Sequence, residues 1–240
     1  LSSYFLTSEK SYKTTIEFGK KTTSYDHTGV VIESNDKVIT LDDIKSVLPK
    51  MTHYQQEPPM VSALKVNGKK LYELARQGIE IEREKRDVHI FKQDIMSYKF
   101  PYLDLLLSVS KGTYIRSYAM DVAAHLNTVA MLKSLRRVQS GSFHVQNAKV
   151  LEDISIEDLI PIEEILDAYP KIQVSDYIAD KVKHGILLDQ RQYHMQEPFR
   201  VYNQSNQMMA KKMETFLKRI FPKWEDVNIE YNWRGLIALS

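Results

Sequence analysis

Tyr114 and Arg116 are the first residues whose position predicts chemistry, because they lie where a strand is expected to lead into a helix. Apolar residues alternate with other residues over 103–109, which predicts a strand, and they recur at helical spacing over 115–126. Thr113 is the expected N-cap of that helix. Polar groups at such a junction can gather around a ligand without disturbing the core.

Arg116 would carry its charge at the unfavourable end of this helix. A cation beside the positive end of the helix dipole is disfavoured by a few tenths of a kcal/mol. An outside anion, either a carboxylate or a phosphate, is therefore its expected partner. A solvated arginine that lies over apolar surface explains the spacing equally well.

Tyr12 lies on another predicted strand, near residues 11–19, where apolar and polar residues alternate. A tyrosine on the more apolar face of a strand is either a core aromatic or the floor of a site. The pattern alone favours the core.

Residues 128–141 predict a second helix that follows the central one. Thr128 is its expected N-cap and Gly141 ends it. Leu135 would face the core, and Arg136 and Arg137 would face outward.

A run of basic residues begins after Pro58-Pro59, which predict an extended approach to a hairpin with its turn at Asn67-Gly68. A hairpin that carries lysines can bind a phosphate backbone. Acidic residues are interleaved with the basic ones over 65–92, so a solvated charged face is the competing interpretation. A helix at 40–48, with Thr40 and Asp43 in capping-box spacing, precedes this region.

The composition is that of a globular protein, with 240 residues, 43% of them hydrophobic and 27% charged. A net charge of +2 does not by itself indicate nucleic acid, because that inference needs clustering. The absence of cysteine excludes disulfides and thiolate metal sites and fits a reducing cytoplasm. No apolar run reaches the length of a membrane span. Because the first residue is Leu1 and not Met, we expect a fragment without its natural N-terminus.

Familiar cofactor motifs are missing from the sequence. It has no phosphate-binding loop, no dinucleotide fingerprint and no His-Glu-x-x-His pair, and its seven histidines are scattered. Pro161 and Pro170 bracket a helix and a linker, which predicts a domain boundary near residue 169. Residues 172–174 and 199–202 then predict strands of a small domain.

Five segments occur in a fixed order between Leu1 and about Leu166. They are Ser8-Glu9-Lys10-Ser11-Tyr12, Pro58-Pro59-Met60-Val61-Ser62-Ala63-Leu64-Lys65, Gly68-Lys69-Lys70-Leu71-Tyr72-Glu73-Leu74-Ala75-Arg76-Gln77-Gly78, Ser110-Lys111-Gly112-Thr113-Tyr114-Ile115-Arg116 and Leu135-Arg136-Arg137-x-x-x-Gly141-x-Phe143. Together they closely resemble the bacterial tRNA pseudouridine synthases of the TruB family. Any one segment would be weak evidence, whereas five in register are strong evidence.

The resemblance implies an α/β (α+β) fold, with a mixed, largely antiparallel sheet and flanking helices over residues 1–168. Residues 52–87 would form an RNA-gripping insertion, and 169–210 a partial, β-rich PUA-like RNA-binding domain. The implied activity is isomerisation of the T-loop uridine at position 55 of tRNA to pseudouridine, without metal or organic cofactor. The expected protein is a cytoplasmic monomer that binds the tRNA T stem-loop and no membrane.

The resemblance also implies roles for individual residues. The residue matching Tyr12 packs on the target base and is a candidate for taking the C5 proton. The residue matching Arg116 pairs with the catalytic aspartate, and those matching Tyr114 and Leu135 line the pocket. The candidate RNA-binding residues are Lys65, Lys69, Lys70, Arg76, Arg83, Arg86, Lys111, Arg136 and Arg137.

The sequence departs from the family pattern in two places. The catalytic aspartate of the family lies in a Gly-His-Thr-Gly-x-Leu-Asp-Pro motif, which we expect upstream of Leu1. Asp26-His27-Thr28-Gly29 is superficially similar, but its register places it in the turn after the Tyr12 strand, so Asp26 is not assigned as the nucleophile. The tail, 211–240, does not match the PUA pattern and is interpreted as divergent or foreign.

Two alternative functions remain at this point. A non-catalytic tRNA-binding or RNA-folding protein could use the same fold and basic hairpin. A flavin oxidoreductase is suggested only by a faint resemblance of residues 221–235 to flavin-dependent amino-acid oxidases, and no flavin-binding fingerprint accompanies it.

Overall fold

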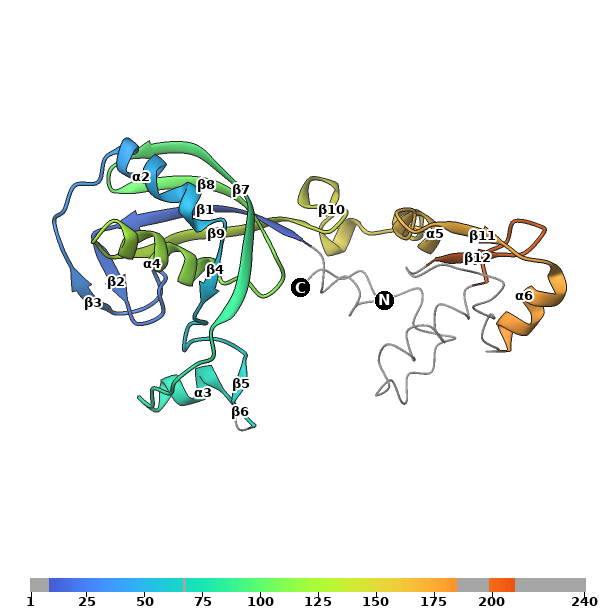
Figure 1. Ribbon diagram of the computed structural model, residues 1–240, viewed down its shortest axis with the longest axis horizontal. Coiled ribbons are helices and arrows are strands. Elements are labelled where there is room, and N and C mark those ends of the chain that lie inside the picture. The colour runs from blue at the N-terminus through green and yellow to red at the C-terminus, as the bar shows by residue number, and fades with distance from the viewer. Residues whose placement is uncertain (1–8, 67, 185–198, 210–240) are drawn as a thin grey trace. The chain divides into compact units, whose positions relative to one another are not determined.

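The computed structural model describes residues 9–66, 68–184 and 199–209. The chain divides into two compact units, one ending at Ala148 and the other beginning at Lys149 (Figure 1). Asn67 of the predicted turn, and the tail with its oxidase-like segment, lie outside the described residues. The predicted domain limits near 168, 169 and 210 stay predictions.

The first unit is built on a six-stranded sheet in which every pair of neighbours is antiparallel. Its strand order is β10-β9-β1-β8-β7-β4. The bounds are β1 Lys10–Phe18, β4 His53–Gln56, β7 Arg86–Lys99, β8 Tyr102–Val109, β9 Ala130–Ser140 and β10 Phe143–His144. Together with its flanking helices this sheet confirms the predicted fold class.

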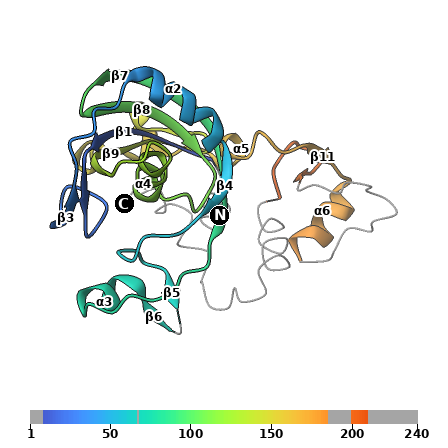
Figure 2. The same ribbon diagram turned by 60° about the vertical axis from the view of Figure 1, so that its left-hand side comes forward.

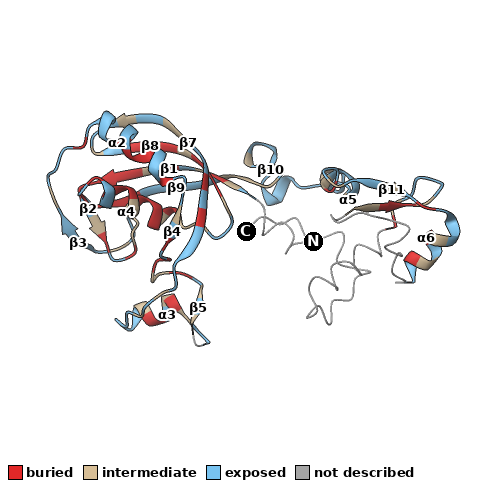
Figure 3. Ribbon diagram, in the orientation of Figure 1, coloured by how far each residue is buried: buried red, intermediate tan, exposed pale blue. Residues whose placement is uncertain are grey.

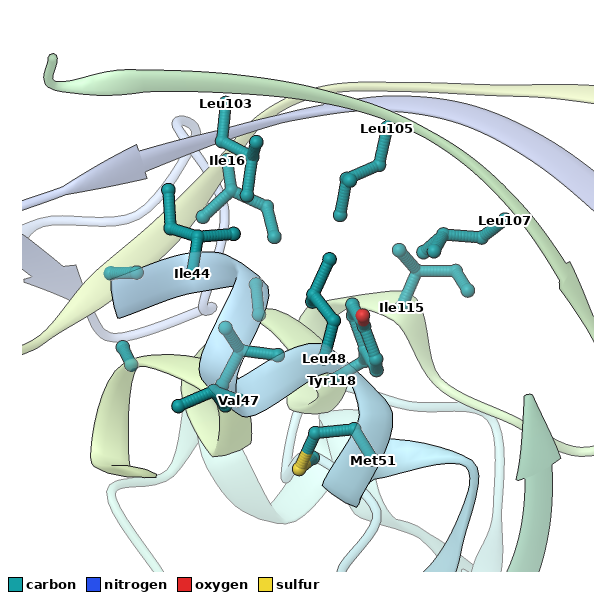
Figure 4. Close-up of a cluster of buried hydrophobic side chains, with 14 of the residues drawn as sticks. Ile16, Ile44, Val47, Leu48, Met51, Leu103, Leu105, Leu107, Ile115 and Tyr118 are labelled. Atoms are coloured by element: carbon teal, nitrogen blue, oxygen red, sulfur yellow. The ribbon is translucent and has the colours of Figure 1, made fainter. Parts of the chain in front are cut away.

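The helices α2, Leu41–Val47, and α4, Ile115–His125, bury their apolar stripes against the sheet. Figure 4 shows side chains of α2 and of the 3-10 helix η1, Leu48–Met51, directed toward Leu105 of β8 and Tyr118 of α4. The capping box predicted for Thr40 is present. Burial of each large apolar side chain contributes roughly 1.5–3 kcal/mol, so this cluster holds α4 and its first turn against the strands.

Tyr12 lies in β1, as predicted, and is half-buried against the same core. The strand β1 pairs with β8 from Lys10↔Val109 to Glu17↔Tyr102. The β7–β8 pairing has two irregularities, one between Ile90 and Lys92 and one between Ile95 and Ser97. The predicted junction of strand and helix at 103–126 is also present, because β8 leads through a turn into α4.

The stretch 128–141 contains the strand β9, Ala130–Ser140, and not the predicted helix. The apolar residues at the start of this stretch suit either structure, and pairing with β1 decides for the strand because it supplies a partner along nearly its whole length. Thr128 donates its hydroxyl to Asn35 and caps no helix. Thr113 is not the N-cap of α4 either, because its hydroxyl donates to the Ser110 carbonyl and Tyr114 takes the cap position.

The predicted basic hairpin is present, with β5, Lys65–Val66, paired to β6, Lys69–Lys70. It leads into the short helix α3, Leu71–Arg76. These elements lie on the long connection between β4 and β7 (Figure 2). Two further strands of the first unit, β2, Lys20–Thr22, and β3, Val31–Ser34, pair with each other and flank a polar loop.

The second unit contains the two strands predicted for the small domain. They are β11, Lys171–Gln173, and β12, Arg200–Tyr202, which pair in parallel. Val201 and residues of the helix α6, Asp176–Lys183, form a separate small core (Figure 3). The remaining assigned elements are short helices. The first unit ends with η2, Val145–Asn147, and the second contains η3, Leu151–Asp153, η4, Ile156–Asp158, and α5, Ile162–Ile165. Within the described parts of both units, no helix is long and apolar enough to cross a membrane.

Candidate active site

Arg116 is held at the start of α4 by groups from two distant parts of the chain. Its Nη1 lies 3.1 Å from the Ser24 carbonyl and 3.4 Å from Asp26 Oδ2, and its Nη2 donates to the Val61 carbonyl at 2.7 Å. The Arg116 side chain is 21% exposed and that of Asp26 is 24% exposed. The anion that the sequence led us to expect beside Arg116 is therefore present within this chain, and it is Asp26.

The Asp26 carboxylate is fixed by its own loop. Its Oδ1 accepts the Ser24 hydroxyl at 2.7 Å, the Thr28 amide at 3.0 Å and the Thr28 hydroxyl at 2.5 Å. Burial alone would raise the pKa of Asp26, but the hydrogen bonds from Thr28 and Ser24, together with the Arg116 charge, outweigh it and lower that pKa. Asp26 is therefore an ionised carboxylate of fixed orientation at neutral pH.

The loop that carries Asp26 is anchored to β9. Leu132 donates its amide to the Tyr25 carbonyl at 3.0 Å and accepts the His27 amide at 2.9 Å. The Thr22 hydroxyl donates to the Asp26 carbonyl at 2.6 Å. Because the strand is part of the main sheet, the position of the carboxylate is set by the core of the domain.

Tyr12 and Leu135 lie on adjacent strands of this sheet. Tyr12 is paired with Arg137, and Thr14 with Leu135, so the two candidate residues share one face. The Arg137 guanidinium stands 5.6 Å from the centroid of the Tyr12 ring, within cation–π range. Leu135 is 48% exposed and leaves apolar surface open beside the half-buried tyrosine.

The strand β9 connects these two groups of candidate residues. Leu132 contacts the Asp26 loop, whereas Leu135 and Arg137 pair with the Tyr12 strand. The helix α4, which carries Arg116, also packs against β9. Tyr114 is half-buried at the N-cap of α4, where its amide donates to the Gln56 side chain at 2.7 Å.

The candidate RNA-binding residues separate into exposed and sequestered ones. Arg83 has an 8% exposed side chain and is paired with Glu57 and Glu80. Lys70 donates to the Tyr72 hydroxyl, and the Arg76 guanidinium lies 5.5 Å from the same ring. The exposed members of the set are Lys65, Lys69, Arg76, Arg86, Lys111, Arg136 and Arg137.

Sequence reasoning missed the supports of Arg116, namely the carboxylate of Asp26 and the carbonyls of Ser24 and Val61. A backbone carbonyl leaves no signal in the sequence. Asp26 did leave one, because aspartate two residues before threonine favours a local turn in which the carboxylate accepts the threonine donors. In residues 9–66, 68–184 and 199–209, no three His, Asp or Glu side chains gather into a group that could hold a metal ion.

Comparison with solved structures identifies the fold. The crystal structure of a Cbf5-Nop10-Gar1 complex matches 85% of this chain and 59% of that chain, with a TM-score of 0.59 at 18% identity. The structure of an H/ACA RNP bound to a substrate RNA containing 2'-deoxyuridine matches with a TM-score of 0.57 at 15% identity, over 86% of this chain and 59% of that one. The fold is therefore that of the pseudouridine synthases.

Sequence comparison gives the family. The N-terminal domain of the TruB family pseudouridylate synthases matches residues 1–115. The tRNA pseudouridine synthase B of Clostridium kluyveri is 35% identical over 86% of this chain and 75% of its own length. That of Ureaplasma urealyticum is 42% identical over 68% of each chain. The chain belongs to the TruB family of pseudouridylate synthases, which confirms the family and the isomerase class predicted from its motifs.

Proposed function

We propose that this chain forms the target-base pocket of a tRNA pseudouridine synthase that isomerises the T-loop uridine at position 55. The observation that carries the proposal is the fixed guanidinium of Arg116 at the start of α4. Its contacts with Ser24, Asp26 and Val61 use three of its five N–H donors among the described residues. Two donors remain for a further carboxylate, which suits a partner of the catalytic aspartate.

Asp26 itself is better suited to hold Arg116 than to attack the substrate. Three donors occupy its Oδ1, and its Oδ2 faces the guanidinium. An attacking carboxylate needs an oxygen lone pair directed at the substrate, and these contacts turn both Asp26 oxygens toward the protein. The sequence contains no Gly-His-Thr-Gly-x-Leu-Asp-Pro motif. We therefore assign the nucleophile to an aspartate outside this chain and expect the chain alone to be inactive.

The proposed reaction breaks the N1–C1′ bond of the uridine and forms a C5–C1′ bond in its place. A proton leaves C5 and N1 gains one, so the base is isomerised without an oxidant or a cofactor. Flipping the base out of the loop costs a few kcal/mol and is offset by stacking, at about 1–3 kcal/mol per base, and by phosphate contacts. Tyr12 would stack on the target base and take the C5 proton, and Tyr114 and Leu135 would line the pocket.

The substrate assignment rests on the relatives and on the exposed basic side chains. The related proteins of Clostridium kluyveri and Ureaplasma urealyticum are named tRNA pseudouridine synthase B. The exposed Lys65, Lys69 and Arg76 of the insertion can neutralise backbone phosphates of a tRNA T stem-loop. We assign residues 52–87 to that insertion and 169–210 to a PUA-like domain of a monomeric cytoplasmic enzyme.

The test is pseudouridine formation on an unmodified T stem-loop RNA. It compares this chain with the motif-bearing protein, defined as the same chain extended upstream by a segment that carries Gly-His-Thr-Gly-x-Leu-Asp-Pro. We expect activity only in the motif-bearing protein. Activity in the shorter chain would contradict our assignment and make Asp26 the leading nucleophile. RNA binding by both proteins, with activity in neither, would favour the non-catalytic RNA-binding function.

A further inference from the structure

Gln56 is a buried amide whose two ends reach two parts of α4. It is 1% exposed, at the end of β4. Its Oε1 accepts the Tyr114 amide at 2.7 Å, and its Nε2 donates to the Tyr54 hydroxyl at 2.8 Å. Tyr54 in turn donates to Asp121 Oδ2 at 2.9 Å. One neutral side chain therefore links the N-cap residue of α4, through Tyr54, to Asp121 in the middle of that helix.

Two neighbouring contacts bind the same stretch to the same helix turn. The Ser117 hydroxyl donates to the Glu57 carbonyl at 2.7 Å, and Arg116 Nη2 donates to the Val61 carbonyl at 2.7 Å. We call residues 56–61 the β4 segment. Three of the four residues from Tyr114 to Ser117 are thus hydrogen-bonded to it.

The chemistry of an amide fits this position. Tyr114 occupies the N-cap of α4 without a side-chain cap of its own, so Gln56 brings a hydrogen-bond acceptor to the helix start from a distant strand. A neutral acceptor satisfies the Tyr114 amide without adding a second carboxylate near Asp121. The donor at the other end of the amide satisfies Tyr54, so neither end of this buried group is left unpaired.

We propose that Gln56 is a positioning residue for the pseudouridine synthase reaction, because it fixes the start of α4 and so directs Arg116 toward the catalytic carboxylate. The inference rests on the proposed function and extends it to β4, a strand with no residue among those expected to touch the base. Gln56 acts through Tyr114 and α4 and touches no reacting atom. A displacement of a catalytic group by about 1 Å can slow a reaction by about 100-fold.

The first test is Gln56→Met in the motif-bearing protein, because methionine fills a similar volume without polar atoms. Under single-turnover conditions, conversion of the T stem-loop should slow by about 10- to 100-fold. The dissociation constant for the RNA should change by less than about threefold, since Gln56 is buried away from solvent. Gln146→Met is the matched control, because Gln146 is an exposed glutamine of the same unit and lies outside the insertion and the candidate site. Its rate should equal that of the parent protein.

The second test is Gln56→Glu, which separates positioning from general stability. A protonated carboxyl offers an acceptor and a donor as the amide does, whereas an ionised carboxylate loses the donor to Tyr54. The groups that face this position are the Tyr54 hydroxyl, the Tyr114 amide and the Asp121 carboxyl, with the Glu57 carboxyl and the His125 ring close to Asp121. The rate of this variant relative to the parent should be highest at low pH and should fall as the pH rises.

The outcomes separate this inference from the proposed function. A parent-like rate in Gln56→Met, or equal losses in rate and RNA affinity, would overturn it, as would a Gln56→Glu rate whose ratio to the parent does not depend on pH. If Gln56→Met does not fold, the pH dependence of the Gln56→Glu rate, relative to the parent, tests the inference in its place. If the parent itself forms no pseudouridine, the proposed function fails. Amide hydrogen exchange at Tyr114 then tests the contact: faster exchange in Gln56→Met than in the parent at the same pH supports it, and equal exchange overturns it.

Discussion

Arg116 is supported from two sides by unlike means. The polar loop, residues 22–29, holds it with the Ser24 carbonyl and with an ionised carboxylate that is itself fixed by three donors. The β4 segment holds it and its helix turn with a neutral amide and two backbone carbonyls. The two supports therefore act differently. The loop balances the charge of the Arg116 guanidinium, whereas the β4 segment fixes the helix turn that carries Arg116 without adding a charge.

Replacing Arg116 itself should have the largest effect, because it removes the group that both supports share. In the motif-bearing protein, Arg116→Ala should lower the single-turnover rate by about 1,000-fold, in the range found when one group that stabilises the transition state is removed. RNA affinity should fall by much less, and Arg116→Lys should restore only part of the rate because lysine cannot make the forked contacts. Equal losses in rate and affinity would refute a role beside the catalytic aspartate.

Removing the charge from the polar loop should have the next largest effect. Asp26→Asn keeps the shape of the side chain and should slow the reaction by about 10- to 100-fold, since the guanidinium loses its fixed counter-ion. RNA affinity, measured at fixed salt, should stay within about threefold. A rate close to that of the parent would show that the neutral contacts of Arg116 are sufficient without the charge of Asp26.

The same variant predicts a change in acid stability. The pKa of Asp26 is lowered in the folded protein below its unfolded value of about 3.9. Ionised Asp26 therefore stabilises the fold above that value, and this contribution is lost as the pH falls through the folded pKa. Between pH 5 and pH 3 the Tm of the parent should fall further than that of Asp26→Asn. Parallel curves would show that the carboxylate is not stabilised in the folded state.

Weakening the neutral support by one contact should have a smaller effect. Ser117→Ala removes the hydroxyl that donates to the Glu57 carbonyl. A single neutral hydrogen bond contributes about 1 kcal/mol, so the rate should fall by about three- to tenfold, with RNA affinity unchanged. Ser46→Ala is a matched control, because the Ser46 hydroxyl also donates to a backbone carbonyl but lies on the exposed surface of α2.

The smallest effect on the reaction is expected from Arg83, which pairs with the side chain of Glu57 within the insertion. Arg83→Met should slow the reaction by no more than about threefold and leave the salt dependence of RNA binding unchanged, because Arg83 is sequestered from phosphates. Arg76→Met is the contrasting variant, since Arg76 is exposed. It should weaken RNA binding and reduce the slope of log K against log salt by about one. Identical slopes for the two variants would contradict this assignment.

The sequence predicted those parts of the site whose signal is local. The alternation in β8, the helical stripe of α4 and the hairpin all depend on neighbouring residues, and the Tyr114–Arg116 junction followed from them. The family was identified because whole motifs survive in order, which needs no knowledge of geometry.

The features that the sequence did not predict depend on contacts between residues far apart in the sequence. Asp26 meets Arg116 across 90 residues of sequence, and Gln56 meets Tyr114 across 58. The stretch 128–141 became a strand because β1 was available to pair with it, which no local pattern reports. Thr113 does not cap α4, because its hydroxyl donates to the Ser110 carbonyl.

The shape of the sheet edge has a consequence for self-association. The strand β4 pairs with β7 only over Arg86–His89, so most of the 14-residue β7 has no strand on its outer side among the described residues. Both irregularities of the β7–β8 pairing fall within that length, and Lys92 and Asp94 project from it. Bulges and charges on an open edge disfavour pairing with a strand of another molecule. The open part of this edge therefore resists edge-to-edge aggregation.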